Sequence, residues 1–251
     1  RQLCSVMAHT HFVGYHTDKP ATQATLKRFA ATLGLRQIDE NLCADEEGLS
    51  AITVRDTGRG NDYIPYTNKP LSWHTDGYYN PPEQPVRAWL LHCVQPAAKG
   101  GENGLCDHEV AYIALREQDT HYVEALSHPN TLTIPANWEG NTLIRPAQSG
   151  PVFSIDLQGQ LQMRYSARKR HIQWRDDPTT QAAATALLGW LETPSPYQLR
   201  YRLEAGEGIL SNNVLHNRTG FTDNPATPRL LYRARYYDRV YAPGETHASS
   251  K

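Results

Sequence analysis

The sequence predicts a single mainly β domain, a barrel or sandwich of short antiparallel strands with two or three helices packed outside. From Ala51 onward, short β-rich runs are separated by turn residues, which is typical of an antiparallel architecture. Strands and helices do not alternate as a βαβ fold requires. No internal repeat or low-complexity segment precedes the polar end of the chain. We expect residues 1–50 to form an N-terminal cover, 51–241 the core and 243–251 a polar tail.

Two helices stand out. The first is predicted over 18–34, with Asp18 as N-cap and Gly34 at its end. The second is predicted near 179–192, between two prolines, and serves as a helical insert in the core. Strands are predicted at 51–55, 88–94, 131–135, 152–156, 161–165, 197–203, 208–215 and 229–238, with a hairpin turn at 157–160.

Size and charge narrow the class of protein. A chain of 251 residues hides roughly three quarters of its extended surface on folding, so one sizeable core is expected. The composition, 39% hydrophobic and 20% charged, excludes collagen, coiled coil and wholesale disorder. A net charge of -1 gives no support for a nucleic-acid partner. The longest apolar run, 88–94, is too short for a bilayer and is interrupted by His92, so we expect a soluble protein.

The four cysteines, Cys4, Cys43, Cys93 and Cys106, are scattered and form no C-x-x-C pair. This usage favours a reducing compartment. No secretion signal follows Arg1, which suggests a processed or trimmed start, and we expect a cytoplasmic protein. The sequence leaves the oligomeric state open, a homo-oligomer included.

Two His-x-Asp triplets occur, whereas 11 histidines and 26 acidic residues give about one His-x-Asp/Glu triplet by chance. The triplet ending at Asp18 has a capping role in the first helix, so we interpret it as structural. His74 and Asp76 lie on a strand-like run, 71–77, that ends at a glycine. Residues two apart on a strand share a face, so this imidazole and carboxylate would point to one place.

A third ligand is predicted at His216, which ends the strand-like run 208–216. The chain then turns and returns through 228–235, which would bring Arg229 beside the same metal. Two imidazoles and one carboxylate leave the opposite coordination positions open. That arrangement is typical of non-haem Fe(II) oxygenases.

These motifs carry a resemblance that extends over roughly 50–240. The segments 65–76, 90–93, 100–103, 215–219 and 229–233 resemble, in order, the taurine dioxygenase and γ-butyrobetaine hydroxylase superfamily of Fe(II)/2-oxoglutarate oxygenases. The resemblance implies a double-stranded β-helix, or jelly roll. It also implies that His74, Asp76 and His216 bind iron and that Arg229 binds the distal carboxylate of 2-oxoglutarate.

The chemistry agrees with these roles. Three protein ligands leave three positions, two for the keto acid and one for O2. Such an enzyme hydroxylates an unactivated C–H bond and converts 2-oxoglutarate to succinate and CO2. The planar guanidinium of Arg229 suits a carboxylate. Where many members carry Thr or Ser, this chain has Asn103, whose amide can still donate a hydrogen bond to the cofactor.

The substrate is expected to be a small anionic metabolite. Positions 229, 231, 233 and 235 share a face by strand alternation, so Arg233 and Arg235 would add uncompensated positive charge near the iron. A carboxylate, sulfonate or phosphate would balance that charge. The alternative is that Arg233 pairs with Glu204 or Asp238, and that Arg235 forms an internal salt bridge.

The resemblance bears on the substrate too. Arg233 matches the family position that holds a sulfonate, and Tyr66 matches one wall of the cage that holds trimethylammonium. Arg235 replaces another tyrosine of that cage. A cation there repels a quaternary ammonium group, so we expect no betaine substrate.

Other interpretations remain open. The same three ligands could hold Zn²⁺ in a hydrolase, or the barrel could be a non-catalytic binding protein. The cluster from Cys106 to Glu109 is interpreted as structural, and His9 and His11 are placed on an early strand without an evident third ligand. The segments 57–64 and 137–148 are expected to form lids over the site.

Overall fold

The computed structural model describes residues 2–39, 48–55, 63–168 and 172–242. The contacts group the chain into two compact units, and the single oxygenase domain stays a prediction. The first consists of residues 1–71, 86–105 and 199–251, and the second of residues 72–85 and 106–198. The predicted tail 243–251, Cys43 and most of the predicted lid 57–64 lie outside the described residues.

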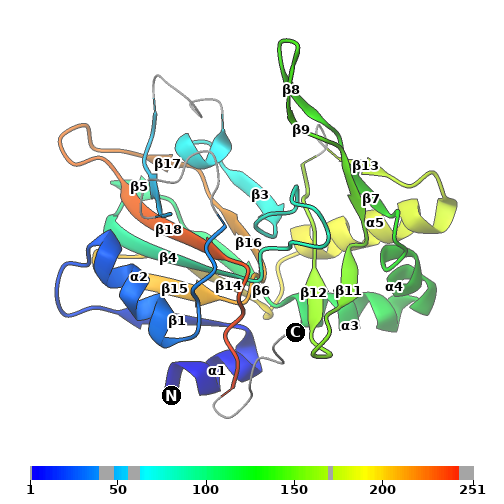
Figure 1. Cartoon of the computed structure of the whole chain (residues 1–251), viewed down its shortest axis with the longest axis horizontal. Helices are drawn as coiled ribbons and strands as arrows, with labels where there is room; N and C mark the ends of the chain where they lie inside the picture. Colours follow the sequence, from blue (N-terminus) through cyan, green and yellow to red (C-terminus); the bar gives the residue numbers. More distant parts are fainter. Residues whose placement is uncertain (1, 40–47, 56–62, 169–171, 243–251) are drawn as a thin grey trace. The chain divides into compact units, whose positions relative to one another are not determined.

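The first unit contains a five-stranded sheet in the order β1-β15-β4-β18-β2, with antiparallel pairing throughout (Figure 1). The second sheet of this unit has β14, β6 and β16 in that order, and β17 pairs with β5. The strands are β1 (Phe12–His16), β2 (Ser50–Ile52), β4 (Ala88–Gln95), β5 (Lys99–Gly100), β6 (Asn103–Cys106), β14 (Gln198–Tyr201), β15 (Glu207–Ser211), β16 (Leu215–Arg218), β17 (Phe221–Thr222) and β18 (Leu230–Tyr236).

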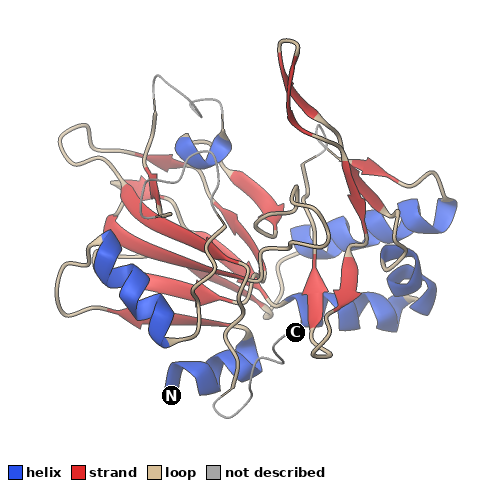
Figure 2. Ribbon diagram, in the orientation of Figure 1, coloured by secondary structure: helices blue, strands red, loops and turns tan. Residues whose placement is uncertain are grey.

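The two faces of the five-stranded sheet bury different clusters. Helices α1 (Gln2–Thr10) and α2 (Gln23–Thr32) cover one face, and Figure 2 shows α2 lying across the strands. Leu90, Leu210 and Ala234 pack there against the helices. On the other face, Trp89, Ile209 and Leu231 pack together with Leu105 of β6, so this cluster joins the two sheets. The short 3-10 helix η1 (Ile64–Tyr66) adds Tyr66 to the same cluster.

The segment 207–218 contributes one strand to each of the two larger sheets of this unit. We predicted a single strand over 208–215, but β15 ends at Ser211 and β16 begins at Leu215. Between them Asn213 has a φ of 57°, a left-handed conformation that asparagine tolerates better than most residues. Its side chain donates to the carbonyl oxygen of Val86 at 2.7 Å. The break turns the chain from one sheet to the other.

The second unit combines helices with small sheets. Helices α3 (His108–Gln118), α4 (Thr120–Leu126) and α5 (Pro178–Glu192) pack against one another. A three-stranded sheet has the order β10-β7-β13, and two hairpins are formed by β8 with β9 and by β11 with β12. The strands are β3 (Leu71–His74), which starts at the unit boundary, β7 (Leu132–Ile134), β8 (Asn137–Glu139), β9 (Thr142–Arg145), β10 (Gln148–Gly150), β11 (Phe153–Ile155), β12 (Leu161–Met163) and β13 (Gln173–Trp174).

The helix predicted over 18–34 is shorter than expected. It begins after Thr22, whose hydroxyl accepts from the backbone N–H of Thr25 while the Thr25 hydroxyl accepts from Thr22. This capping box satisfies the first free N–H groups, so Asp18 is not the N-cap. The helix predicted near 179–192 is confirmed as α5, which starts at Pro178 after the N-cap Asp177. Within the described ranges, no helix is both long and apolar enough to cross a bilayer.

Candidate active site

His74 and Asp76 converge as predicted, but the backbone that brings them together differs from the expectation. Strand β3 ends at His74, and Asp76 lies in the turn that follows, next to Gly77 with a φ of 68°. The Nε2 atom of His74 and the Oδ1 atom of Asp76 are 3.8 Å apart, and both side chains are buried. A turn, rather than strand alternation, therefore sets the geometry.

A neighbouring segment fixes this backbone. The N–H of Thr75 donates to the carbonyl oxygen of Tyr165 at 3.0 Å, and the N–H of Tyr165 donates to the Thr75 hydroxyl at 3.0 Å. The N–H of Ala167 donates to the carbonyl oxygen of Trp73 at 2.8 Å. His74 itself forms a β-bridge with Ser166. These contacts hold the histidine and the aspartate in one orientation.

The imidazoles of His74 and His216 are oriented in the same way. Nδ1 of His74 lies 2.9 Å from the carbonyl oxygen of Ser72, and Nδ1 of His216 lies 2.9 Å from that of Val214. Because a carbonyl oxygen only accepts, each Nδ1 carries the proton and each Nε2 keeps its lone pair. His216 belongs to β16, where its ring centroid lies 4.8 Å from that of Trp89. Each ring thus presents the nitrogen that a metal needs.

Arg229 and Asn103 line one small cavity of the first unit, of about 10 Å³, with room for about one water molecule. Arg229 is 4% exposed, and its guanidinium lies 4.9 Å from the ring centroid of Phe221. Burial lowers the pKa of Arg229 to about 10, although Cys93 and Asp223 oppose the shift, so the group is charged at neutral pH. Among the described residues, the buried Nδ2 of Asn103 has no hydrogen-bond partner.

Two glycines shape this cavity. Gly100 and Gly101 both line it and have φ values of 77° and 75°. A Cβ on Gly100 would lie 2.4 Å from the carbonyl oxygen of Gly220, and one on Gly101 would lie 3.6 Å from Nε of Arg229. Position 100 therefore admits no side chain without displacing the chain at residue 220.

The arginine face predicted for β18 keeps its alternation. Arg229 comes directly before β18, and the extra residue of the β-bulge beside Leu230 and Leu231 lies on β4, between Cys93 and Gln95. Arg229 and Leu231 line the same small cavity. Arg233 lies opposite Leu91, and Arg235 opposite Trp89. These two arginines share the face that carries Leu231 in the cluster between the sheets.

Arg235 does not bring uncompensated charge, contrary to what we expected. It forms an ion pair with Asp39, and both side chains are buried. Asp39 also accepts from the hydroxyl of Tyr237 at 2.7 Å. This is the internal salt bridge that we kept as the alternative for Arg235.

Glu204 and Asp238, the carboxylates suggested as partners for Arg233, also contact other groups, and their pairing with Arg233 stays an alternative. Glu204 pairs with Arg202 at 3.6 Å, and Asp238 accepts from the backbone N–H groups of Arg36 and Gln37. Arg233 itself is half-buried. No signal close to Arg235 in the sequence pointed to Asp39, which lies on a distant segment.

Tyr66, the predicted wall of a substrate pocket, is 2% exposed and packs in the cluster between the sheets. The guanidinium carbon of Arg55 lies 4.1 Å from the centroid of its ring. An arginine therefore occupies the aromatic face that the family resemblance assigned to a cation.

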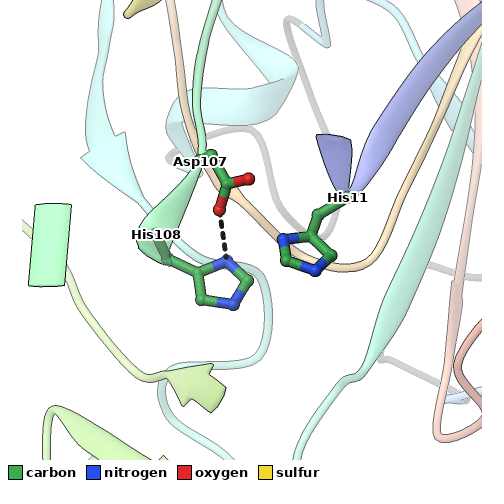
Figure 3. A group of neighbouring side chains, drawn as sticks. All are labelled: His11, Asp107 and His108. Carbon is green, nitrogen blue, oxygen red and sulfur yellow. Dashed lines mark ion pairs between the residues drawn. The ribbon is translucent and has the colours of Figure 1, made fainter. Parts of the chain in front are cut away.

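The stretch from Cys106 to Glu109, which we interpreted as structural, forms the start of α3. Asp107 caps α3 by accepting from the N–H of Glu109 at 2.9 Å. Figure 3 shows Asp107 beside His108, whose Nδ1 lies 3.9 Å from its Oδ1. Figure 3 also draws His11, which follows α1 and belongs to the first unit. The early strand predicted for His9 and His11 is wrong, because His9 lies in helix α1.

Comparison with known proteins identifies the family. Residues 8–235 match the model described as "Taurine catabolism dioxygenase TauD, TfdA family". The chain belongs to this family. The solved structure of the non-heme iron oxygenase OrfP in complex with Fe and alpha-ketoglutaric acid is similar with a TM-score of 0.68 at 15% identity, covering 94% of this chain and 78% of that one. This likeness confirms the predicted mainly β jelly-roll fold.

Two relatives of this TauD/TfdA family member carry the same name. A uridine-5'-phosphate dioxygenase from an Amycolatopsis species is 31% identical over 169 residues, which are 65% of this chain and 60% of the relative. A uridine-5'-phosphate dioxygenase from a Streptomyces species is 28% identical over 208 residues, 79% of this chain and 72% of the relative. The chain thus matches less than two thirds of the length of the Amycolatopsis protein.

Proposed function

We propose that this protein is an Fe(II)/2-oxoglutarate-dependent dioxygenase that hydroxylates an unactivated C–H bond of a small anionic metabolite. The observation that carries the proposal is the buried pair of His74 and Asp76, held 3.8 Å apart on a backbone fixed by a neighbouring segment. Membership of a dioxygenase family supports it. Bound iron, with 2-oxoglutarate and O2, supplies the oxidising power for C–H cleavage.

The proposed iron ligands are His74, Asp76 and His216. Both histidines hold Nδ1 on a backbone carbonyl, which fixes the ring and leaves Nε2 to bind the metal. The carboxylate of Asp76 offers an anionic oxygen in a buried setting, as an Fe(II) ligand requires. The donor set therefore fits the 2-His-1-carboxylate chemistry of this family.

The proposed keto-acid contacts are Arg229 and Asn103. A guanidinium that stays charged holds a carboxylate through two parallel hydrogen bonds. The buried amide of Asn103 adds a donor that lacks a partner in the described part of the chain. The cavity beside them would take the end of a ligand rather than a whole one. If the same three ligands held zinc in a hydrolase, neither Arg229 nor Asn103 would have a role in binding a cofactor.

For the substrate, we propose a phosphate ester or another small anion. The two relatives named for uridine-5'-phosphate make a phosphate ester the first candidate. Arg233 is the substrate contact that we propose on β18, whereas Arg235 pairs with Asp39. Tyr66, with Arg55 over its ring, would form an adjoining wall of the pocket. The cysteines Cys4, Cys93 and Cys106 are free, which agrees with the cytoplasmic location that we propose.

The first experiment adds Fe(II) and 2-oxoglutarate to the protein without oxygen. We expect a weak visible charge-transfer band that is lost in His74→Ala. His121→Ala is the matched control, because His121 is exposed on α4 and belongs to the same unit. In air, succinate formation is then measured across phosphate esters, sulfonates and carboxylates, with uridine-5'-phosphate included. A wild-type protein that gives neither the band nor succinate would refute the proposed activity.

A further inference from the structure

The second unit holds two arginines, Arg145 and Arg164, that have no carboxylate partner within the described residues. Both are anchored by neutral backbone oxygens instead. Nη1 and Nη2 of Arg164 donate to the carbonyl oxygens of Leu132 and Gln148 at 2.8 and 2.9 Å, and those of Arg145 donate to Pro146 and Pro135 at 3.1 and 2.8 Å. Carbonyl oxygens orient a guanidinium without cancelling its charge.

The two charges lie close enough to affect each other. Burial lowers the pKa of Arg164 to about 10, and repulsion from Arg145 contributes to the shift. Burial also lowers the pKa of Arg145. In addition, the buried Nε of Arg164 has no hydrogen-bond partner in the part of the chain that the structure describes. Two like charges withdrawn from water are costly unless an anion joins them.

Tyrosines connect these arginines to the proposed metal ligands of the same unit. The guanidinium carbon of Arg145 lies 5.9 Å from the ring centroid of Tyr79. The rings of Tyr79 and Tyr78 are 5.3 Å apart, and the ring of Tyr78 meets that of His74 edge-on at 6.4 Å. Arg145 comes from β9 of the hairpin formed with β8, labelled in Figure 1, which is the segment that we predicted to be a lid.

We propose that Arg145 and Arg164 form a binding site for a phosphate group, which holds the phosphate of the substrate near His74. This inference rests on the proposed function and narrows its substrate to phosphate monoesters. A phosphate monoester carries close to two negative charges at neutral pH and has three acceptor oxygens, which suits two guanidinium groups. A carboxylate or sulfonate carries only one charge. The tyrosine hydroxyls would add donors.

The test is a calorimetric titration with inorganic phosphate at constant ionic strength. Wild-type protein should bind one phosphate, and Arg145→Gln and Arg164→Gln should each weaken binding by about tenfold or more. Arg116→Gln is the matched control, since it removes the same charge from an exposed position on α3 of the same unit. Thermal midpoints measured without phosphate show whether each variant is folded. If Arg164→Gln fails to fold, Arg164→Lys replaces it. Lysine keeps the positive charge but lacks the planar pair of donors of a guanidinium, so this variant should bind phosphate with intermediate affinity.

Three results would overturn the inference. They are no binding by the wild type, equal binding by the Arg145→Gln and Arg116→Gln proteins, and loss of binding only in Arg233→Gln. Succinate formation from 2-oxoglutarate by the wild type separates this inference from the proposed function. If the wild type forms succinate but does not bind phosphate, only the proposed phosphate site is refuted. If it binds phosphate but forms no succinate, the proposed oxygenase activity is refuted and the phosphate site stands.

Discussion

Nδ1 of His74 lies 2.9 Å from the carbonyl oxygen of Ser72, two residues earlier in the chain. His216 repeats this relationship with Val214. Each histidine thus carries its own orienting acceptor, set by local backbone rather than by a distant side chain. The Nε2 atoms, which we propose as iron ligands, are therefore oriented by the backbone alone, which would reduce the free-energy cost of organising a metal site.

Asp76 should be essential for metal binding, and the aspartate of the other triplet should not. Asp76→Asn keeps the shape but removes the charge, so we expect the Fe(II) affinity to fall on the order of 100-fold or more. Asp18→Asn is the control, since His16 and Asp18 form the same sequence pattern on the exposed surface. Anaerobic equilibrium titration with Fe(II) gives both affinities. Similar losses in the two variants would show that Asp76 is not a ligand.

Thr75 should act on the metal site through the backbone. Thr75→Val leaves the buried N–H of Tyr165 without its 3.0 Å acceptor, which costs about 1–3 kcal/mol of the free energy of unfolding. We also expect Fe(II) affinity to fall by about tenfold to 100-fold, because two of the proposed ligands, His74 and Asp76, flank this residue. Thr133→Val loses only an exposed hydroxyl contact with Ser149 and serves as control. Urea denaturation and metal titration should both distinguish the variants.

The ion pair between Asp39 and Arg235 should matter for stability. Both side chains are buried, so Asp39→Ala leaves a charge without its partner, and unfolding should become easier by about 3–5 kcal/mol. Asp39→Ala combined with Arg235→Met should recover part of this loss, because no uncompensated charge remains at the pair. Chemical denaturation of the wild type, of Asp39→Ala, of Arg235→Met and of the double variant gives the coupling free energy between the two residues. Full additivity of the two single losses would contradict the pairing.

Arg229 should control the affinity for 2-oxoglutarate. We expect Arg229→Gln to raise the KM for 2-oxoglutarate by about tenfold or more, with Arg229→Lys intermediate because lysine lacks the planar fork. The charge of Arg229 is lost only as the pH rises through about 10, so this residue predicts a flat KM between pH 6 and 8 and a rise towards pH 10. Succinate formation at varied 2-oxoglutarate gives these values. An unchanged KM in Arg229→Gln would remove it from the cofactor site.

The local parts of the fold were readable from the sequence. The hairpin of β11 and β12 was predicted because two β-rich runs flank a turn that contains glycine, and α5 because apolar residues recur at helical spacing between two prolines. Helix α3 was not predicted, although Asp107 as N-cap and the spacing of Ala111 and Leu115 could have indicated it. The turn at Asp76 was mistaken for strand because the run 71–77 contains few turn residues before Gly77.

Contacts between residues far apart in the chain could not be predicted from the sequence in the same way. Nothing near Arg235 in the sequence identifies Asp39, since the register of β18 and the path of a distant loop bring the two together. The cluster of Arg145 and Arg164 was invisible for the same reason. Each arginine bonds to carbonyl groups, which every residue possesses, so no residue type marks the contact.

The turn at Asn213, which has a left-handed backbone conformation, sets the length of the link between β15 and β16. In a strand, removing or adding one residue reverses which side every later residue faces. A single deletion at this break would therefore either strain the link or shift β16 by one residue, and such a shift would turn the imidazole of His216 to the other face of its sheet. In natural variants or designed libraries of this chain, substitutions here can be sampled, but the length of this link must be conserved.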